Sequence, residues 1–477
     1  MNTEKHGKRE LLLLFALFIA SLPAVTARLY SSDEVEYFSY LRSLWFDHDV
    51  SFENEYRYFY DHRVAQTADF HQTFLELQTA TGRRINYGTM GCAVLWAPFY
   101  GVADLATRVR RVMGSAVEAD GYSQPYVSAV AYGSAFYGFA AIVIAVAAAR
   151  RVVGTYEISS GLAVWLGTPL LFYMYVAPPF SHACSAFAVA LFVAVWLNVR
   201  QTWNVGGVVA LGLAGALMAM VREQDLLCAL GPAVDFALAQ IKGQGNRAKG
   251  KGKGERLHAL KVAAAGACAF LIGYLPQLIA YQALNGFPRP SPLVTRKMFW
   301  YSPHAVQVLL DPEHGFLLWT PLALLALAGL ILLVAVPRSV VADDVVGNDR
   351  RQIAGCMLLM VAMQVYISGA VESWTVAGAF GQRRFVAVTI FLVIGLAAFR
   401  RWVRSRAMRI ATNLVIVLCV WWNLALTLEF GTSMMDHQKL ELRRNAYDAF
   451  VTLPRTAPKL LYRYFTNRSS FYKPATD

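Results

Sequence analysis

Residues 85–107, INYGTMGCAVLWAPFYGVADLAT, determine how the rest of the chain is threaded through a membrane. The stretch is moderately apolar, and if it crossed a bilayer, every later segment would change sides. Its aromatic residues Tyr87, Trp96, Phe99 and Tyr100 are typical of the boundary between membrane and water. We therefore expect this stretch to lie in the interface on the outer face, without crossing the bilayer.

The composition of the chain indicates a membrane protein. Of its 477 residues, 56% are hydrophobic and 16% are charged, whereas soluble domains carry about 45–50% apolar and about 25% charged residues. The mean hydropathy is +0.40. These values exclude a disordered or collagen-like chain, and they disfavour a purely soluble enzyme.

Eleven segments come close to the roughly 20 apolar residues that a spanning helix requires. They are 11–29, 126–149, 158–177, 183–199, 204–221, 225–241, 261–284, 315–336, 353–371, 385–399 and 410–430. The first resembles a cleavable signal peptide, but ten further spans follow it, and we expect a retained anchor. The sequence therefore predicts an all-α, polytopic membrane protein. Its six cysteines, which lie in apolar stretches without metal-ligand spacing, are expected to be buried and free.

The distribution of lysine and arginine predicts the orientation. The net charge is +13, and the basic residues concentrate before the first span and in alternate loops around Arg150, Arg200, 242–261, Arg350 and 400–409. Cytoplasmic loops of membrane proteins carry such an excess. We expect a transmembrane domain over 1–430 with the N-terminus inside. Its long first outer loop would cover 30–125 with two interfacial helices, 242–261 would be a basic cytoplasmic loop, and 431–477 would be a short outer tail.

Two adjacent carboxylates, Asp33 and Glu34, follow the first span directly. The apolar residues of 35–46 recur at helical spacing, which predicts an amphipathic helix lying on the membrane, with Ser32 or Asp33 as its N-cap. Asp33 is either a helix cap alone or a general base at the membrane surface. A carboxylate in this position can take the proton of an acceptor hydroxyl.

Acidic and imidazole side chains are dense between Asp47 and His71. Such groups suit a divalent metal, which leaves a metal site possible in this first outer loop. Their spacing matches no recognised metal-binding loop, so we favour a solvated loop, assign no metal ligands and expect no required cofactor. Arg83 and the arginine that follows it either neutralise these acids or meet a phosphate.

The remaining candidates are basic residues near the predicted outer face. They are His182 in Pro178-Pro179-Phe180-Ser181-His182, Arg222 in Arg222-Glu223-Gln224-Asp225, Lys297, and Arg383 and Arg384 in Gly381-Gln382-Arg383-Arg384-Phe385. Arginine binds phosphate with bidentate geometry. Arg222 requires an anion, which is either Glu223 or Asp225 or a lipid-linked phosphate. His182 is alternatively structural, and the paired arginines alternatively anchor the chain at the interface.

These motifs together resemble the GT-C class of integral-membrane glycosyltransferases. The similarity extends over most of 10–430 and is closest to the protein O-mannosyltransferases and the lipid A aminoarabinose transferases. The resemblance is carried by the Asp33-Glu34 pair after the first span, the long first outer loop, the Pro179-Phe180-Ser181-His182 motif, Arg222-Glu223-Gln224, the Asp311-Pro312-Glu313-His314-Gly315 turn and the Gly381–Phe385 motif. The chain differs from both families in its short outer tail.

The resemblance implies an inverting glycosyltransferase with a polyprenyl-phosphate-linked sugar as donor. Asp33 would be the base, and Glu34 would orient the hydroxyl acceptor or pair with a basic neighbour. The acceptor is a lipid, a glycan or a protein. Arg222, Arg383 and Arg384, with Arg83, Lys297 or His182, would hold the leaving phosphate. The active site would face the periplasm from a bacterial inner membrane.

Two other functions fit the same pattern. A flippase or transporter for lipid-linked saccharides would also need outer arginines, although it would not need the acidic pair. A structural subunit of an envelope assembly complex is the third interpretation. The predicted span centres are almost uncharged, which disfavours an ion-coupled transporter, because such proteins place ionisable groups at mid-membrane. No partner is expected to be a nucleic acid.

Overall fold

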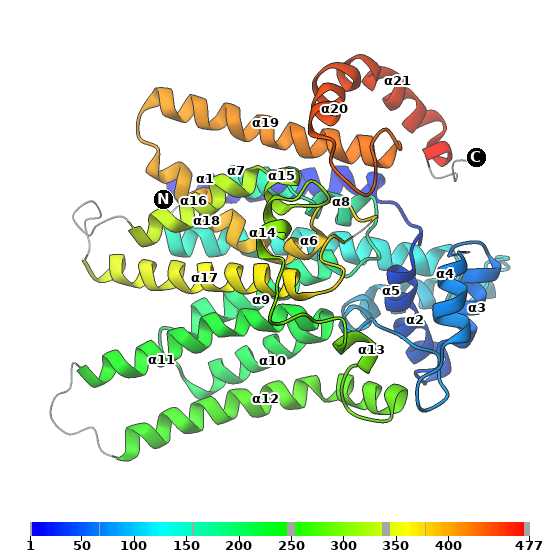
Figure 1. Cartoon of the computed structure of the whole chain (residues 1–477), viewed down its shortest axis with the longest axis horizontal. Coiled ribbons are helices and arrows are strands. Elements are labelled where there is room, and N and C mark those ends of the chain that lie inside the picture. Colours follow the sequence, from blue (N-terminus) through cyan, green and yellow to red (C-terminus); the bar gives the residue numbers. More distant parts are fainter. Residues whose placement is uncertain are drawn as a thin grey trace.

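The computed structural model describes residues 2–65, 67–154, 157–245, 253–335, 344–376 and 378–471. Within these residues the chain forms helices and two isolated β-bridges, without a strand. Long helices run alongside one another in a common direction, and shorter helices cover one end of the bundle (Figure 1). The prediction of an all-α polytopic membrane protein is confirmed.

Most of the predicted spans correspond to single helices. They are α1 (Asn2–Ser21), α6 (Gln124–Val153), α9 (His182–Val199), α10 (Val205–Val221), α12 (Lys253–Asn285), α16 (Leu322–Ala335), α17 (Asp344–Ala370), α18 (Thr389–Trp402) and α19 (Arg406–Gly431). Six helical stretches in the described chain are long and apolar enough to cross a membrane, and three shorter ones are apolar. The span 385–399 begins in a 3₁₀ turn, η6 (Arg383–Val388), and 315–336 begins in α15 (Phe316–Trp319).

The predicted span 158–177 is not one helix. It divides into α7 (Ile158–Leu166) and α8 (Leu170–Tyr175) around Gly167-Thr168-Pro169, because proline lacks the N–H that would continue a helix. The side-chain amide of Asn423 donates to the carbonyl oxygens of Leu166 and Thr168 at 2.8 and 3.0 Å. A neighbouring helix thus satisfies backbone groups that the break exposes. The span 225–241 likewise begins as a 3₁₀ segment, η4 (Glu223–Ala229), before α11 (Leu230–Gly245).

The loops that were predicted to share the cytoplasmic side do meet at one end of the bundle, called the basic end here. Arg200 pairs with Asp349 at 2.5 Å, and Arg401 donates to the carbonyl of Val153 at 2.6 Å. The predicted loop 242–261 is helical in its described parts, since α11 ends at Gly245 and α12 begins at Lys253. Its centre, 246–252, lies outside the described residues.

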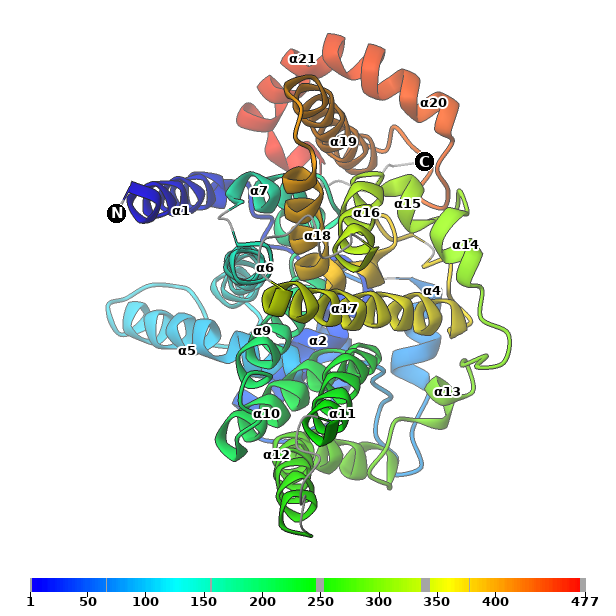
Figure 2. The same ribbon diagram turned by 90° about the vertical axis from the view of Figure 1, so that its left-hand side faces the viewer.

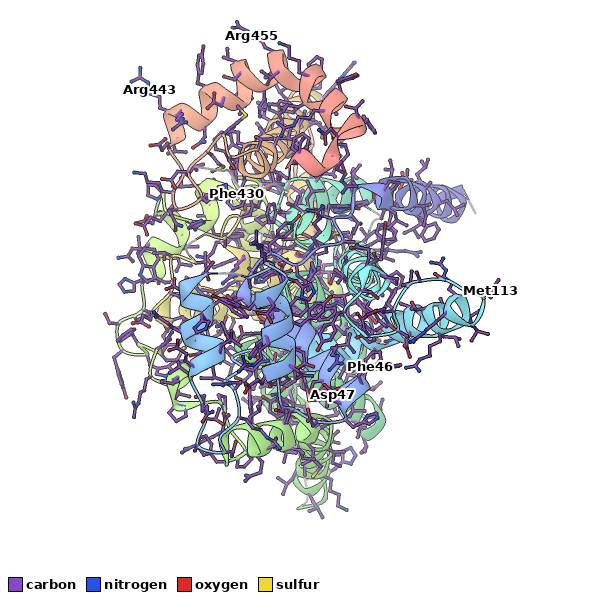
Figure 3. The ribbon with its side chains drawn as sticks, turned by 90° about the vertical axis from the view of Figure 1, so that its right-hand side faces the viewer. Phe46, Asp47, Met113, Phe430, Arg443 and Arg455 are labelled. Atoms are coloured by element: carbon purple, nitrogen blue, oxygen red, sulfur yellow. The ribbon has the colours of Figure 1, made fainter. Side chains whose placement is uncertain are left out.

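The decisive stretch 85–107 forms most of helix α5 (Gly91–Val112). This helix lies across the bundle and projects from its flank, ending beside Met113 (Figures 2 and 3). Val102 and Leu105 on its surface are 70% and 66% exposed. Its direction and its exposed apolar face fit the predicted interfacial position, and it is not among the membrane-capable helices of the described chain.

Helix α2 (Ser32–Arg42), by contrast, does not lie on the membrane as predicted. Most of its side chains are buried, because α3 (Glu53–Asp61) and α5 cover it. The ring of Phe38 meets the rings of Phe59 and Tyr100 edge-on, at 5.5 and 6.1 Å. The N-cap is Ser31, one residue before the predicted cap.

Short helices complete the opposite end, called the site end. They are α4 (Ala68–Phe70), α13 (Pro292–Thr295), α14 (Ala305–Leu310), α20 (Leu442–Tyr447) and α21 (Leu453–Thr466). Helices α20 and α21 arch over α19 (Figure 1). The arch is fastened to the end of the first span, because Arg468 donates to the carbonyls of Pro23 and Ala24 at 2.6 and 2.7 Å. The six cysteines are free, and all but Cys268 are buried.

Candidate functional site

Asp33 and Arg383, 350 residues apart in the sequence, form an ion pair at the site end. A guanidinium nitrogen of Arg383 lies 2.6 Å from Oδ2 of Asp33, and the two side chains are 22% and 37% exposed. The guanidinium also lies over the ring of Phe180, 5.4 Å from its centre. The candidate base therefore stands in the first turn of α2 with its carboxylate accessible from outside.

Glu34 has other surroundings, although it is the next residue. Its carboxylate is buried and accepts the backbone N–H groups of Tyr30 and Ser31, which completes a capping box at the start of α2. Burial raises the pKa of Glu34 to about 8, because a buried carboxylate loses the hydration that stabilises its charge. The contacts of Glu34 position the backbone before Asp33, and its role in orienting an acceptor stays a prediction.

Glu36 is a second buried carboxylate beside the ion pair, and the sequence reasoning assigned it no role. Its Oε1 accepts the backbone N–H of Tyr87 at 2.6 Å. Burial raises the pKa of Glu36 well above its usual value, and the charge of Asp33 raises it further. The sequence spacing could have indicated Glu36 as a site residue, because Asp33 and Glu36 are three residues apart and such residues lie on neighbouring parts of one helix face.

Arg222 ends α10 in an extended conformation, so its side chain turns back onto the start of α9. Its guanidinium donates to Oγ of Ser181 and to Oε1 of Gln224, both at 3.1 Å, and lies 3.4 Å from Nδ1 of His182. Its Nε is buried without a hydrogen-bond partner. In the described chain, Arg222 has no ion pair with a carboxylate.

The two acids that could have neutralised Arg222 bind elsewhere. Glu223 accepts the hydroxyl groups of Tyr274 and Tyr281, at 2.6 and 2.8 Å. Asp225 accepts the hydroxyl of Ser185 at 2.6 Å. Neither carboxylate contacts the Arg222 guanidinium, so the interpretation of a local ion pair is not supported.

Arg384 is a second arginine of the site, and it is buried more deeply than Arg222. It is 6% exposed and donates to the carbonyl and hydroxyl oxygens of Ser373, at 2.9 and 3.0 Å. These partners are neutral, and no ion pair of Arg384 exists in the described part of the chain. Its burial argues against simple anchoring in the interface, where the guanidinium would reach water.

The three arginines lie close enough to act on the same neighbours. The charges of Arg222, Arg383 and Arg384 all reach the ring of His182, which is buried. Tyr173 experiences the charges of Asp33, Arg222 and Arg383. Tyr173 sits inside a predicted span, and no sequence signal marked it. We call Asp33, Arg222, Arg383 and Arg384 the arginine cluster; it has three cations and one exposed carboxylate.

Two glycines allow the backbone to approach this cluster closely. Gly381 adopts φ +59° just before Arg383, a conformation that favours glycine. At Gly91 a Cβ atom would lie 2.3 Å from the backbone of Met220 and Val221. The start of α5 therefore packs directly on the end of α10, where Arg222 leaves the helix.

Lys297 and Arg83 are placed at the edge of the site. The ammonium group of Lys297 lies 5.8 Å from the centre of the Tyr87 ring, and Tyr87 is the residue that binds Glu36. Arg83 contributes its carbonyl to hydrogen bonds from Thr79, and its contacts do not reach the arginine cluster. Arg84 neutralises the acidic loop through Glu53 at 2.9 Å.

The acidic first loop also pairs with arginines. Glu55 accepts from Arg42 at 3.0 Å, and Asp47 binds the same guanidinium. In the described residues, no three His, Cys, Asp or Glu side chains are arranged to hold a metal ion. A metal in this loop was one expectation from the sequence, and metal dependence stays untested.

Comparisons with known proteins relate this fold to a solved structure. No family model and no curated protein matches the sequence significantly. Among solved structures, the fold is similar to ArnT from Cupriavidus metallidurans, which was solved bound to undecaprenyl phosphate. The TM-score is 0.53 over 96% of this chain and 78% of that one, at 14% identity. The chain therefore shares the polytopic helical fold of the GT-C membrane glycosyltransferases, of which ArnT, a lipid A aminoarabinose transferase, is an example.

Proposed function

We propose that this chain is a membrane glycosyltransferase that moves a sugar from a polyprenyl-phosphate donor to a hydroxyl group. The observation that carries the proposal is the arginine cluster, in which the partly buried Arg222 and the buried Arg384 have no ion pair within the described residues. Burying an unpaired charge costs several kcal/mol. A phosphate between these guanidinium groups would supply the missing anion and accept bidentate hydrogen bonds.

The same cluster contains Asp33, the carboxylate that the reaction needs as a base on the acceptor side. Asp33 removes the proton of the acceptor hydroxyl, whose oxygen attacks the anomeric carbon of the sugar. The bond from that carbon to the phosphate oxygen breaks, and its electron pair leaves with the polyprenyl phosphate. Attack from the face opposite the leaving group inverts the anomeric configuration. Fixed cations that meet the developing phosphate charge lower the barrier.

The place of the cluster in the bundle suits a lipid donor. It lies where α9, α10 and η6 begin or end, which puts a bound phosphate at headgroup depth and leaves a prenyl tail in the bilayer. The excess of basic residues at the opposite end supports a site that faces away from the cytoplasm, the periplasm of a bacterial inner membrane. The fold shared with ArnT, solved with undecaprenyl phosphate, supports the same class of donor.

Binding of the lipid phosphate tests the central observation. We expect Arg222→Gln and Arg384→Gln each to weaken binding of undecaprenyl phosphate to the purified protein at least tenfold, because each removes a charged hydrogen-bond donor worth about 1.5–3 kcal/mol. Arg57→Gln is the matched control, since Arg57 is exposed and pairs with Glu53 on α3. Equal binding by all three variants would overturn the proposal.

Transfer tests the assignment of the base. Asp33→Asn should lower the rate of transfer from a radiolabelled polyprenyl-phosphate sugar about 10²–10⁴-fold, as loss of a general base does. Its thermal stability should stay close to wild type, because a partly exposed ion pair contributes about 0–1 kcal/mol. Asp47→Asn removes a comparable ion pair with Arg42 and should keep the activity. Movement of the intact lipid across proteoliposomes without transfer would favour the flippase instead.

A further inference from the structure

A cavity of about 330 Å³ lies at the basic end, where the turn from α18 to α19 packs beside the start of α7. Its polar lining residues are Glu157, Arg400, Arg401, Arg409, Thr412 and Asn413. The volume falls within the range of about 300–1,000 Å³ that small-molecule sites occupy. No residue of the arginine cluster lines it, so this cavity, called the turn cavity here, is a separate site.

The lining of the turn cavity has more cations than anions. Three arginines line it, and Glu157 is the single carboxylate among its lining residues. Nε of Arg400 lies 3.7 Å from that carboxylate, and this pair neutralises one of the three guanidinium groups. Arg401 and Arg409 instead donate to backbone carbonyl groups, at 2.6 and 3.2 Å. Because a carbonyl group carries no net charge, the lining is complementary to an anion.

An exposed apolar face of α19 begins beside the turn cavity. Ile410 and Leu414, one turn apart on this helix, are 61% and 60% exposed. Arg409 and Asn413 immediately precede them, so the apolar face and the cavity-lining face are adjacent on the helix surface. A ligand whose anionic group occupies the cavity can therefore lay a hydrocarbon chain along α19.

The position of the turn cavity along α19 corresponds to the level of lipid headgroups. Helix α19 is long and apolar enough to cross a membrane, and the cavity lies against its first two turns, at Arg409 and Thr412. Figure 1 shows the α18–α19 turn at the end of the long helices. Trp402, which ends α18, is 48% exposed, and tryptophan is enriched at the boundary between membrane and water. The surrounding lipid thus supplies anionic groups at this level.

We propose that the turn cavity binds the headgroup phosphate of an anionic phospholipid from the leaflet at the basic end. The phosphate accepts charged hydrogen bonds from Arg401 and Arg409. Thr412 and Asn413 supply neutral donors for the other headgroup oxygens, and an acyl chain lies along the exposed apolar face of α19. Basic pockets between membrane helices are suited to anionic headgroups in this way. The inference is independent of the proposed function.

Titration with short-chain lipids tests which ligand the turn cavity takes. Dioctanoyl phosphatidylglycerol is added to the full chain in a neutral detergent, and the rise of the melting temperature gives an apparent dissociation constant. Dioctanoyl phosphatidylcholine has the same chains without net charge, and glycerol phosphate has the anion without chains. We expect saturable stabilisation by phosphatidylglycerol, and binding weaker by roughly tenfold or more for either comparison. Equal binding of phosphatidylcholine, or of glycerol phosphate, would overturn the proposal of an anionic lipid.

Paired substitutions test whether the lipid binds in the turn cavity. The double variant Arg400→Gln, Arg409→Gln should weaken phosphatidylglycerol binding about tenfold, a loss of roughly 1.4 kcal/mol. The matched control is Arg404→Gln, Arg406→Gln, which removes the same charge from exposed positions of the same turn that do not line the cavity. Arg409→Gln alone leaves the Arg400 pair intact and should weaken binding in the same direction. Arg222→Gln, at the site end, should bind this lipid as wild type does. Equal losses in the two double variants, or a loss in Arg222→Gln alone, would overturn the proposal.

Discussion

Neighbouring carboxylates of this chain differ because helix geometry turns consecutive side chains about 100° apart. Asp33 is accessible and meets a cation from η6, whereas Glu34 is turned into the protein and binds backbone N–H groups. The acidic pair that marked the site in the sequence is therefore a candidate base followed by a helix cap.

Glu34 should make the stability of the protein depend on pH. Its pKa is raised from 4.5 to about 8 by burial, so the folded protein binds this proton more tightly than the unfolded chain does. The stabilisation is complete below about pH 4.5 and is lost as the pH rises through about 8. We expect the melting temperature of wild type to fall across this window, and the fall to be smaller in Glu34→Gln.

The control for this titration is Glu372→Gln, because Glu372 is exposed. It should reproduce the pH profile of wild type. An unchanged slope in Glu34→Gln would show that the carboxylate is ionised in the folded state at neutral pH. Thermal unfolding in detergent, followed by intrinsic fluorescence from about pH 5 to about pH 9 in small steps, provides the measurement, because this range covers most of the window.

At the scale of elements, glycine sets how closely helices can pack. A Cβ atom on Gly329 of α16 would lie 1.8 Å from the carbonyl oxygen of Gly395 in α18. Small residues at such contacts let two backbones meet, and in membranes this packing replaces the hydrophobic effect as the source of association. Helix α18 follows directly on η6, which carries Arg383 and Arg384, so this contact also supports the site.

Gly329→Ala should therefore destabilise the protein. Overpacking of this kind costs about 1–3 kcal/mol, because α16 and α18 must separate. Gly355→Ala is the matched control, since a Cβ atom added to Gly355 in α17 would meet nothing within 4 Å; it should be neutral or stabilising by about 0.5–1 kcal/mol. The melting temperature should fall in Gly329→Ala and stay or rise in Gly355→Ala. A Gly329→Ala variant as stable as Gly355→Ala would contradict the close contact between α16 and α18.

At the scale of the whole molecule, one carboxylate at the basic end connects three helices. Asp235 of α11 is buried and accepts from Trp196 and Arg200 near the end of α9, and from Gln352 of α17. A fully satisfied buried group of this kind fixes the mutual arrangement of helices. The site at the other end depends on that arrangement, because α9 and α17 extend toward it.

Asp235→Asn should lower the stability by about 1.5–3 kcal/mol, since it removes the charged acceptor shared by Trp196 and Arg200 while Asp349 still pairs with Arg200. Asp349→Asn is the control, because Asp349 binds the same arginine from a side chain that is 54% exposed; it should cost about 1 kcal/mol or less. Thermal unfolding of both variants gives the comparison, and equal losses would contradict the central role of Asp235.

The orientation in the membrane is a further whole-molecule prediction. We expect a cysteine at Ala116, at the site end, to react with a membrane-impermeant maleimide in intact cells, and one at Arg404, at the basic end, to react only after the membrane is opened. Both are made in a Cys268→Ala background, because Cys268 is the exposed cysteine. The reverse pattern would place the arginine cluster in the cytoplasm and end the proposed use of an outer-leaflet donor.

Local composition was sufficient to predict the spans and the grouping of the loops. Hydropathy and the Lys/Arg excess are sums over neighbouring residues, so they need no knowledge of distant contacts. For the same reason they missed the break at Gly167-Thr168-Pro169, which Asn423 compensates from another helix, and the burial of α2 beneath α3 and α5. Those features depend on residues that lie far away in the sequence.

The sequence by itself determined a basic, polytopic helical membrane protein and placed its candidate site residues near the ends of the predicted spans. Only the tertiary structure decided which of them meet: it joined Asp33 to Arg383, gave Glu223 to two tyrosines, and left Arg222 and Arg384 without an anion among the described residues. The physical reason is that ion pairing depends on where each helix ends and how it is rotated. Those geometries are fixed by packing between segments that local sequence patterns do not relate.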